Sequence, residues 1–382
     1  MNNAVFDGNY KFTAKDFFFK ILSGSAQGIL IGVLPSAVLK YVLLPFIKGG
    51  QAWAMDLNAI LVLFSSFIPI LIGVAIALQF KMKSLDVGVM AIATGAASGS
   101  IKWATAPAGF VNPVSGVKAP APTTVYMAQG AGDVINAMVV AAIGVLVIWL
   151  VAKYLNGFGA IAVVLSPLVI GGGVAMLGHA IAPYVGAITT AIGDAVATFT
   201  NLQPVPMAIF IAMAFAFIIV TPVSTVGIAL AISLAGVGSG AAGVGVVATT
   251  VVLLINSIKV NKTGTTVAIF LGAMKGMMPS VFKKPIMIVS FLATAAISAL
   301  PVALFNVQGT PTSAGFGWIG MVSPIQSMLV DTADKTFISS AVGIMPGLIT
   351  WFVVPIVAGF AMDFLFSKVL HLYSPEDFKQ DM

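Results

Sequence analysis

A cluster of hydroxyl side chains around a proline is the first feature of the sequence that could do chemistry. Residues 221–225 read Thr-Pro-Val-Ser-Thr and follow the apolar run 206–220. Proline lacks an amide hydrogen and clashes with the preceding turn, so the sequence predicts a broken helix here. In membrane transporters such breaks expose backbone groups that bind polar solutes. We therefore expect Thr221, Pro222, Ser224 and Thr225 to contribute to a solute site.

A second interpretation of this stretch stays open, because serine and threonine hydroxyls also satisfy the backbone at ordinary proline kinks. The run GVGSGAAGVG, residues 236–245, follows directly. Its small residues favour close packing of membrane helices. A phosphate-binding loop would need a preceding strand and a following Lys-Ser/Thr, and the sequence has neither. Nucleotide binding is not expected.

Other polar residues interrupt apolar segments further along the chain. In residues 305–324, glycines alternate with hydroxyls and aromatics, and such a segment enters a membrane only where it is buried in protein or lines a cavity. His179 and Asn256 lie within apolar runs, although a lone histidine near a span end is often simply hydrated. Lys275, Asp133 and Asp194 lie close enough to predicted helix ends to snorkel. These segments add the candidate binding residues Asn256, Thr310, Thr312, Ser313, Gly315, Gly317 and His179.

The sequence offers no pattern typical of a catalytic or metal site. It contains no cysteine and two histidines, which excludes thiolate chemistry and disulfides. Its aspartates are scattered rather than paired. We expect no catalytic residues, no metal and no cofactor.

Composition determines which elements must position these residues. Of 382 residues, 59% are hydrophobic and 8% are charged, against about 25% charged in soluble domains. Apolar runs near the length needed to cross hydrocarbon recur along the chain, so we predict an all-α, polytopic integral membrane protein with about ten transmembrane helices and some re-entrant or broken segments. The net charge of +6 suits lysines in cytoplasmic loops, so no nucleic-acid partner is implied. The predicted spans are 21–47, 55–80, 133–153, 159–183, 206–220, 224–236, 238–257, 264–280, 285–306 and 339–366.

Three segments resemble a known family. They are TPVSTVGIALAISLAGVGSGAAGVG (221–245), LLINSIKVNKTGTTVAIFLGAMKGMMPSVFKKP (253–285) and NVQGTPTSAGFGWIGMVSPI (306–325). They resemble stand-alone phosphotransferase-system EIIC proteins of the second EIIC family, some labelled perfringolysin O regulator-like. GTPTSAGFG (309–317) is the most specific motif.

The resemblance implies an EIIC-like fold, in which a dimerising scaffold carries a mobile transport domain. On this basis we expect an amphipathic segment at 1–20, a scaffold at 21–205, a transport part at 206–366 and a polar tail at 367–382. In the sugar-transporting superfamily a glutamate and a histidine hold the solute, and a IIB partner phosphorylates it. Here the only glutamate, Glu376, is in the tail, so the site would rely on hydroxyls, amides and backbone.

The expected function is transport of a small polar solute, sugar- or polyol-like, by alternating access across a bacterial cytoplasmic membrane. An anion held at half-helix N-termini is an alternative solute. The expected partners are the lipid bilayer, a second copy in a homodimer and possible separate IIA and IIB components, while the chain alone is not expected to be an enzyme. A membrane-embedded ligand sensor or regulator without net transport is the alternative function.

Overall fold

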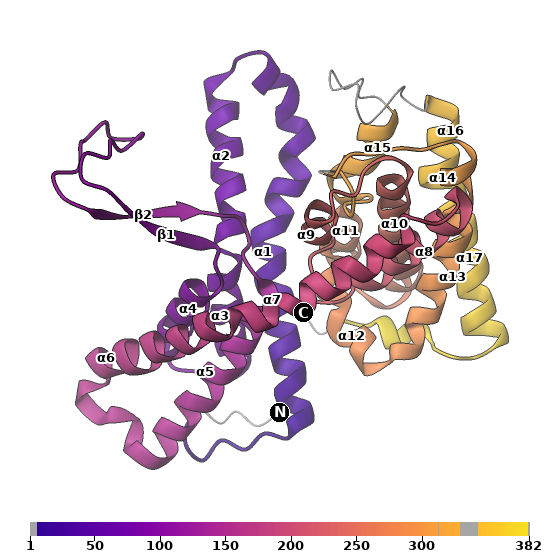
Figure 1. Ribbon diagram of the computed structural model, residues 1–382. Helices are drawn as coiled ribbons and strands as arrows, with labels where there is room; N and C mark the ends of the chain where they lie inside the picture. The colour runs from indigo at the N-terminus through magenta and orange to yellow at the C-terminus, as the bar shows by residue number, and fades with distance from the viewer. Residues whose placement is uncertain (1–5, 312, 329–342, 381–382) are drawn as a thin grey trace.

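The computed structural model describes residues 6–311, 313–328 and 343–380, and helices dominate these ranges. Among the described residues, the buried hydrophobic side chains form two large cores and a small cluster of Leu43, Ala54 and Leu61. The helices that carry the two large cores form two bodies side by side (Figure 1). One core gathers buried residues between Phe6 and Val174, together with Met278. The other gathers buried residues between Val196 and Phe378. The molecule therefore has a first half and a second half, named here after these two cores.

The first half is built on a long amino-terminal helix that packs along α3. Its glycines permit a close approach, since a Cβ at Gly28 would lie 2.5 Å from the Ile72 nitrogen. Residues 156–172, between α5 and α7, form short 3₁₀, α and π turns. The elements are α1 (Ala14–Lys48), α2 (Ala52–Ser66), α3 (Ile68–Gln79), α4 (Ser84–Ala97), β1 (Ile101–Ala106), β2 (Thr123–Ala128), α5 (Val134–Leu155), α6 (Ala162–Leu165) and α7 (Gly173–Phe199).

The second half surrounds α10, which is buried along most of its length. The 3₁₀ turn η3 (Ala273–Met277) joins α11 to α12. The helices are α8 (Pro204–Ile218), α9 (Thr225–Ala231), α10 (Gly236–Val260), α11 (Thr263–Leu271), α12 (Met278–Lys283), α13 (Ile288–Ser298), α14 (Leu300–Leu304), α15 (Val322–Met328), α16 (Ile344–Leu348) and α17 (Val354–Asp363).

The glycine-rich start of α10 brings neighbouring backbones into close contact, which confirms the packing interpretation of residues 236–245. A Cβ at Gly240 would lie 2.2 Å from the Val307 carbonyl oxygen, and one at Gly245 would lie 2.1 Å from that of Ala212. Both distances are far below van der Waals contact. Only glycine fits at these positions without moving α8 or the 305–321 segment.

We expect Gly245→Ala to destabilise the second half, because the added methyl group would push α10 away from α8. Overpacking of this kind costs about 1–3 kcal/mol. Thermal unfolding in detergent should show a lower midpoint than for the wild type. Gly173→Ala is the matched control, since its Cβ would meet nothing within 4 Å. Equal midpoints for the two variants would contradict this account of the packing.

The described residues contain fewer helical segments that qualify as spans by length and composition than the ten predicted from the sequence pattern. Within the described ranges, five helical segments are long and apolar enough to cross a membrane, or six if the pair α2 and α3, bent by 55°, counts as one span. The prediction of a multi-pass helical protein is confirmed in this coarser form, and the count of ten is not. The five segments are Val134–Leu155, Phe158–Phe199, Gly236–Val260, Pro285–Leu304 and Ile344–Val369.

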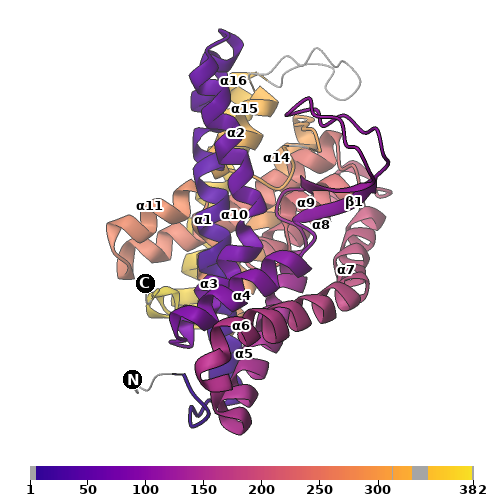
Figure 2. The same ribbon diagram turned by 90° about the vertical axis from the view of Figure 1, so that its left-hand side faces the viewer.

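Part of the connection between α4 and α5 is a small antiparallel sheet. Strands β1 and β2 pair with Ile101 opposite Ala128 and Ala106 opposite Thr123. Most residues of the hairpin are exposed, and Trp103 contacts His179 on α7 with ring centroids 5.6 Å apart. Figure 2 shows the hairpin on the same side of the molecule as α7.

The predicted break in the helix at Pro222 is confirmed. Helix α8 ends at Ile218 and α9 begins only at Thr225, so residues 219–224 form a non-helical connection. A second irregular segment lies close by, because Gly236 and Gly309 exchange backbone hydrogen bonds of 2.9 and 3.0 Å. Val307, Ala314 and Trp318 are buried, which confirms that this polar interruption is enclosed in protein.

Candidate functional site

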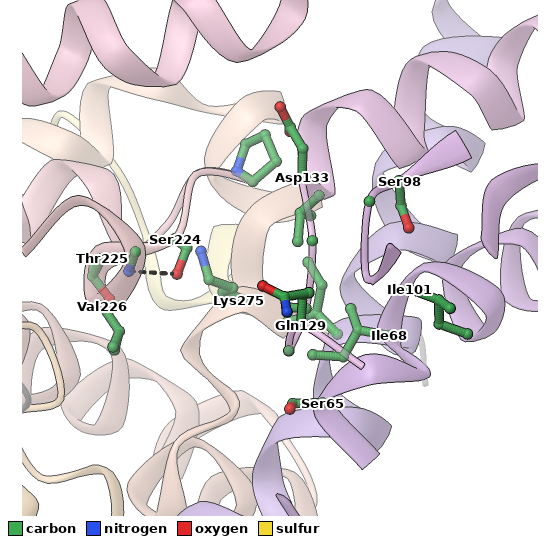
Figure 3. Close-up of a pocket in the computed structure, with 18 of the residues that line it drawn as sticks. Ser65, Ile68, Ser98, Ile101, Gln129, Asp133, Ser224, Thr225, Val226 and Lys275 are labelled. Carbon is green, nitrogen blue, oxygen red and sulfur yellow. Dashed lines mark hydrogen bonds between the residues drawn. The ribbon is translucent and has the colours of Figure 1, made fainter. Parts of the chain in front are cut away.

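A cavity of about 1060 Å³ lies between the two halves (Figure 3). From the first half, α1, α2, α3, α4, β1, the 129–133 loop and α7 contribute to its wall. From the second half, the break between α8 and α9, the α11–η3 connection and the 305–321 segment contribute. Ligand pockets are typically about 300–1,000 Å³. The volume therefore accommodates a small solute together with water.

The broken helix forms one side of this cavity. Pro222, Ser224 and Thr225 line it, as the sequence led us to expect, while Thr221 is buried outside the wall. The hydroxyls also hold the break together. Ser224 Oγ accepts from the Gly227 amide at 2.9 Å, and Thr225 Oγ1 donates to the Gly315 carbonyl at 2.9 Å.

The Thr221 hydroxyl contributes to the break and not to the cavity wall, since its Oγ1 donates to the Ile218 carbonyl at 2.7 Å. The two interpretations of the hydroxyl cluster are therefore compatible in this fold. Thr221 caps the end of α8, while Ser224 and Thr225 both stabilise the break and line the cavity.

Lys275 completes this side of the cavity. It lies on η3, and its Nζ donates to the carbonyl oxygens of Thr221 at 2.6 Å and Val223 at 2.7 Å. The break leaves these carbonyls without helical amide partners, and the ammonium group replaces them. The Lys275 side chain also lines the cavity, next to Ser224 (Figure 3). The sequence suggested that Lys275 could snorkel from a helix end; in the structure its ammonium group binds the backbone of the break instead.

The facing wall comes from the first half, and several polar side chains stand among its apolar residues. Ser98 and Gln129 line it, and Asp133 precedes α5, where its Oδ1 accepts from the Asn136 amide at 3.0 Å. Ser65 at the end of α2 and His179 on α7 also line the cavity. Of the residues predicted from sequence, the structure thus brings His179 together with Pro222, Ser224 and Thr225.

The other predicted residues lie outside the cavity wall. Asn256 is buried in α10, where its amide donates to Asp363 Oδ1 at 2.6 Å. Ser313 Oγ accepts from the Thr310 amide at 2.9 Å, within the buried segment. The remaining predicted residues support that same segment: Gly315 accepts the Thr225 bond, and the Gly317 amide donates to Ser323 Oγ at 2.9 Å. Thr312 lies outside the described residues.

Sequence reasoning missed several groups that face the cavity. Lys275 had a detectable signal, because it stands alone between glycines in the apolar stretch LGAMKGMM, away from the other lysine clusters. Ionisable residues inside apolar segments are candidates for function by default. Ser65, Ser98 and Gln129 had no comparable signal, since the packing of separate elements brings them to the wall.

Comparison with known families agrees with this architecture. The model of the family described as "Phosphotransferase system, EIIC" matches residues 19–380, so the chain belongs to that family. This confirms the resemblance seen in the three quoted segments. The comparisons with curated proteins and with solved structures found no match. Together with the apolar helices, family membership makes the protein a multi-pass membrane component of phosphotransferase-type transport.

Proposed function

We propose that the protein carries a small polar solute across the membrane, and that the cavity between the two halves holds the solute during transport. The observation that carries the proposal is the position of the cavity. The cavity lies between the two cores, and the broken helix whose exposed carbonyls bind Lys275 forms one wall. Unwound helix segments at such interfaces are typical solute sites in transporters.

The mechanism that we propose is alternating access. Residues 206–366 move as the transport part against the scaffold formed by residues 21–205, which also carries the dimer interface. Relative motion of the two parts opens the cavity to each side of the membrane in turn. The division of the buried residues into two cores supports this mechanism, because each core can stay intact when one half moves.

Family membership adds the partners. We propose that separate IIA and IIB chains deliver phosphoryl groups to the solute in a bacterial cytoplasmic membrane. Such a reaction needs a hydroxyl on the solute as the acceptor. The polar side chains Ser65, Ser98, Gln129 and Ser224 of the cavity wall suit a solute with several hydroxyls.

The test combines binding with flux. Detergent-purified protein is screened by thermal shift against sugars, polyols, sugar acids and nucleosides, since a ligand present at a hundredfold excess over its Kd stabilises the folded state by about 2.7 kcal/mol. Uptake of each hit into proteoliposomes, with and without IIA and IIB chains, then measures transport. Binding without flux in either condition would contradict the transport proposal and favour a ligand sensor.

Ser224→Leu should weaken binding of the hit and reduce its uptake. The variant replaces a polar group of the wall with a larger apolar side chain and removes the acceptor of the Gly227 amide. Ser115→Leu, in the exposed loop of the hairpin, is the matched control. Unchanged affinity and uptake in Ser224→Leu would remove this wall from the solute path.

A further inference from the structure

We infer that the solute of this cavity carries a carboxylate, and that the carboxylate binds the ammonium group of Lys275. The inference rests on the proposed function, because it names the chemical class of the solute that the cavity takes. It uses three observations: the hydrogen bonds of Lys275, the absence of a neighbouring carboxylate in the described structure, and the charges of the cavity wall.

The hydrogen bonds of Lys275 use part of its capacity. An ammonium group has three N–H donors, and two carbonyl oxygens, those of Thr221 and Val223, accept from this one. Carbonyls are neutral, so they orient the group without cancelling its charge. The cavity lies beside it. The ammonium group is thus fixed in place with one N–H donor available to a solute.

Lys275 also differs from the lysines that have ion-pair partners in the protein. Lys20, Lys259 and Lys284 lie 3.0, 3.3 and 3.4 Å from aspartate oxygens. Within the described parts of the chain, no carboxylate oxygen comes within 4.0 Å of Lys275 Nζ. An enclosed charge without a counter-charge is costly. A carboxylate on the solute would supply the missing partner.

The rest of the wall does not cancel the charge of Lys275. Among the described residues that line the cavity, the other ionisable side chains are Lys102, His179 and Asp133. Two lysines therefore face one aspartate, and Asp133 already accepts a bond from the Asn136 amide. The neutral polar groups around them, on serine and glutamine, can pair with hydroxyls. The wall as a whole suits a small hydroxy acid better than a neutral polyol.

Matched pairs of solutes test the inference. D-gluconate is compared with D-glucitol, and D-glucuronate with D-glucose, since each pair has similar hydroxyls and differs in the carboxylate. Binding is measured by isothermal titration to the purified full-length protein and to Lys275→Gln. Glutamine retains N–H donors for the two carbonyls but has no charge. Lys153→Gln, an exposed lysine on α5 over the Trp149 ring, is the matched control.

The expected result is that at least one acid binds the wild type, and its neutral partner binds much more weakly. Lys275→Gln should lose about ten- to a hundredfold in affinity for the acid, the range expected for a hydrogen bond to a charged group. Lys153→Gln should bind like the wild type. Unchanged gel-filtration elution of Lys275→Gln shows that the variant is folded.

Other outcomes separate this inference from the proposed function. One outcome is that an acid and its neutral partner bind with equal affinity and that Ser224→Leu abolishes the binding of both. This would overturn the inference of a carboxylate but keep the cavity as the solute site. Binding that survives Ser224→Leu would place the solute elsewhere and overturn both. Failure of both acids to bind, or an unchanged preference for the acid in Lys275→Gln, would overturn the inference of a carboxylate on the solute. Neither result would contradict the proposed transport function.

Discussion

Lys275→Met lowers the stability of the second half and abolishes solute uptake, if the lysine holds the broken helix in the way its geometry indicates. Methionine keeps the unbranched shape and most of the length of the side chain and removes every donor. The carbonyls of Thr221 and Val223 then lose their partner. A buried acceptor left unsatisfied costs about 1–3 kcal/mol, and water from the cavity offsets part of this. We expect a net loss of about 2 kcal/mol.

The measurement is thermal unfolding in detergent, followed by uptake in proteoliposomes. Lys102→Met removes an exposed lysine from another part of the same cavity wall and serves as the control. It should leave the unfolding midpoint close to that of the wild type. A midpoint for Lys275→Met that equals the wild type would show that the two carbonyl contacts contribute nothing to the folded state.

Attaching a bulky group at position 224 should stop transport completely. The natural chain has no cysteine, so Ser224→Cys introduces the only thiol, and the substitution itself is nearly isosteric. A maleimide coupled to it would occupy the cavity beside Lys275 and prevent the two halves from closing. Uptake should fall to the level of empty liposomes after labelling, while the unlabelled variant transports.

The control for this experiment is Ser115→Cys in the exposed loop of the hairpin. Its labelling should leave uptake unchanged, because the loop is outside the cavity wall. Full transport by labelled Ser224→Cys would contradict the proposed solute path. Loss of uptake in both labelled variants would show that the reagent acts on the assembly in general.

The sequence predicted those features that depend on local chemistry. Proline has no amide hydrogen for the helix and clashes with the preceding turn, so a gap at Pro222, between α8 and α9, could be anticipated. The small residues of 236–245 predicted close packing for a similar reason, and Gly245 provides it. The apolar composition predicted a multi-pass helical protein, and the quoted segments identified the family.

Features that depend on long-range packing could not be predicted in this way. Asn256 is a polar residue in an apolar helix. Nothing in the neighbouring sequence indicates that its side-chain amide donates to Asp363, which is 107 residues away. The role of Lys275 requires knowledge that η3 faces residues 221–223, which are more than fifty positions earlier in the chain. The number of spans also depends on where helices bend, as between α2 and α3.

The central claim is that the cavity between the halves holds the transported solute, and protection of Ser224→Cys from labelling tests it most directly. The rate of maleimide coupling is measured with and without the solute that stabilises the wild type most in the thermal-shift screen. At about ten times Kd, roughly one site in eleven is free, so coupling should slow about tenfold, and Ser115→Cys should be unaffected. An unchanged rate at Ser224→Cys, with binding to the same variant confirmed by titration, would contradict the account.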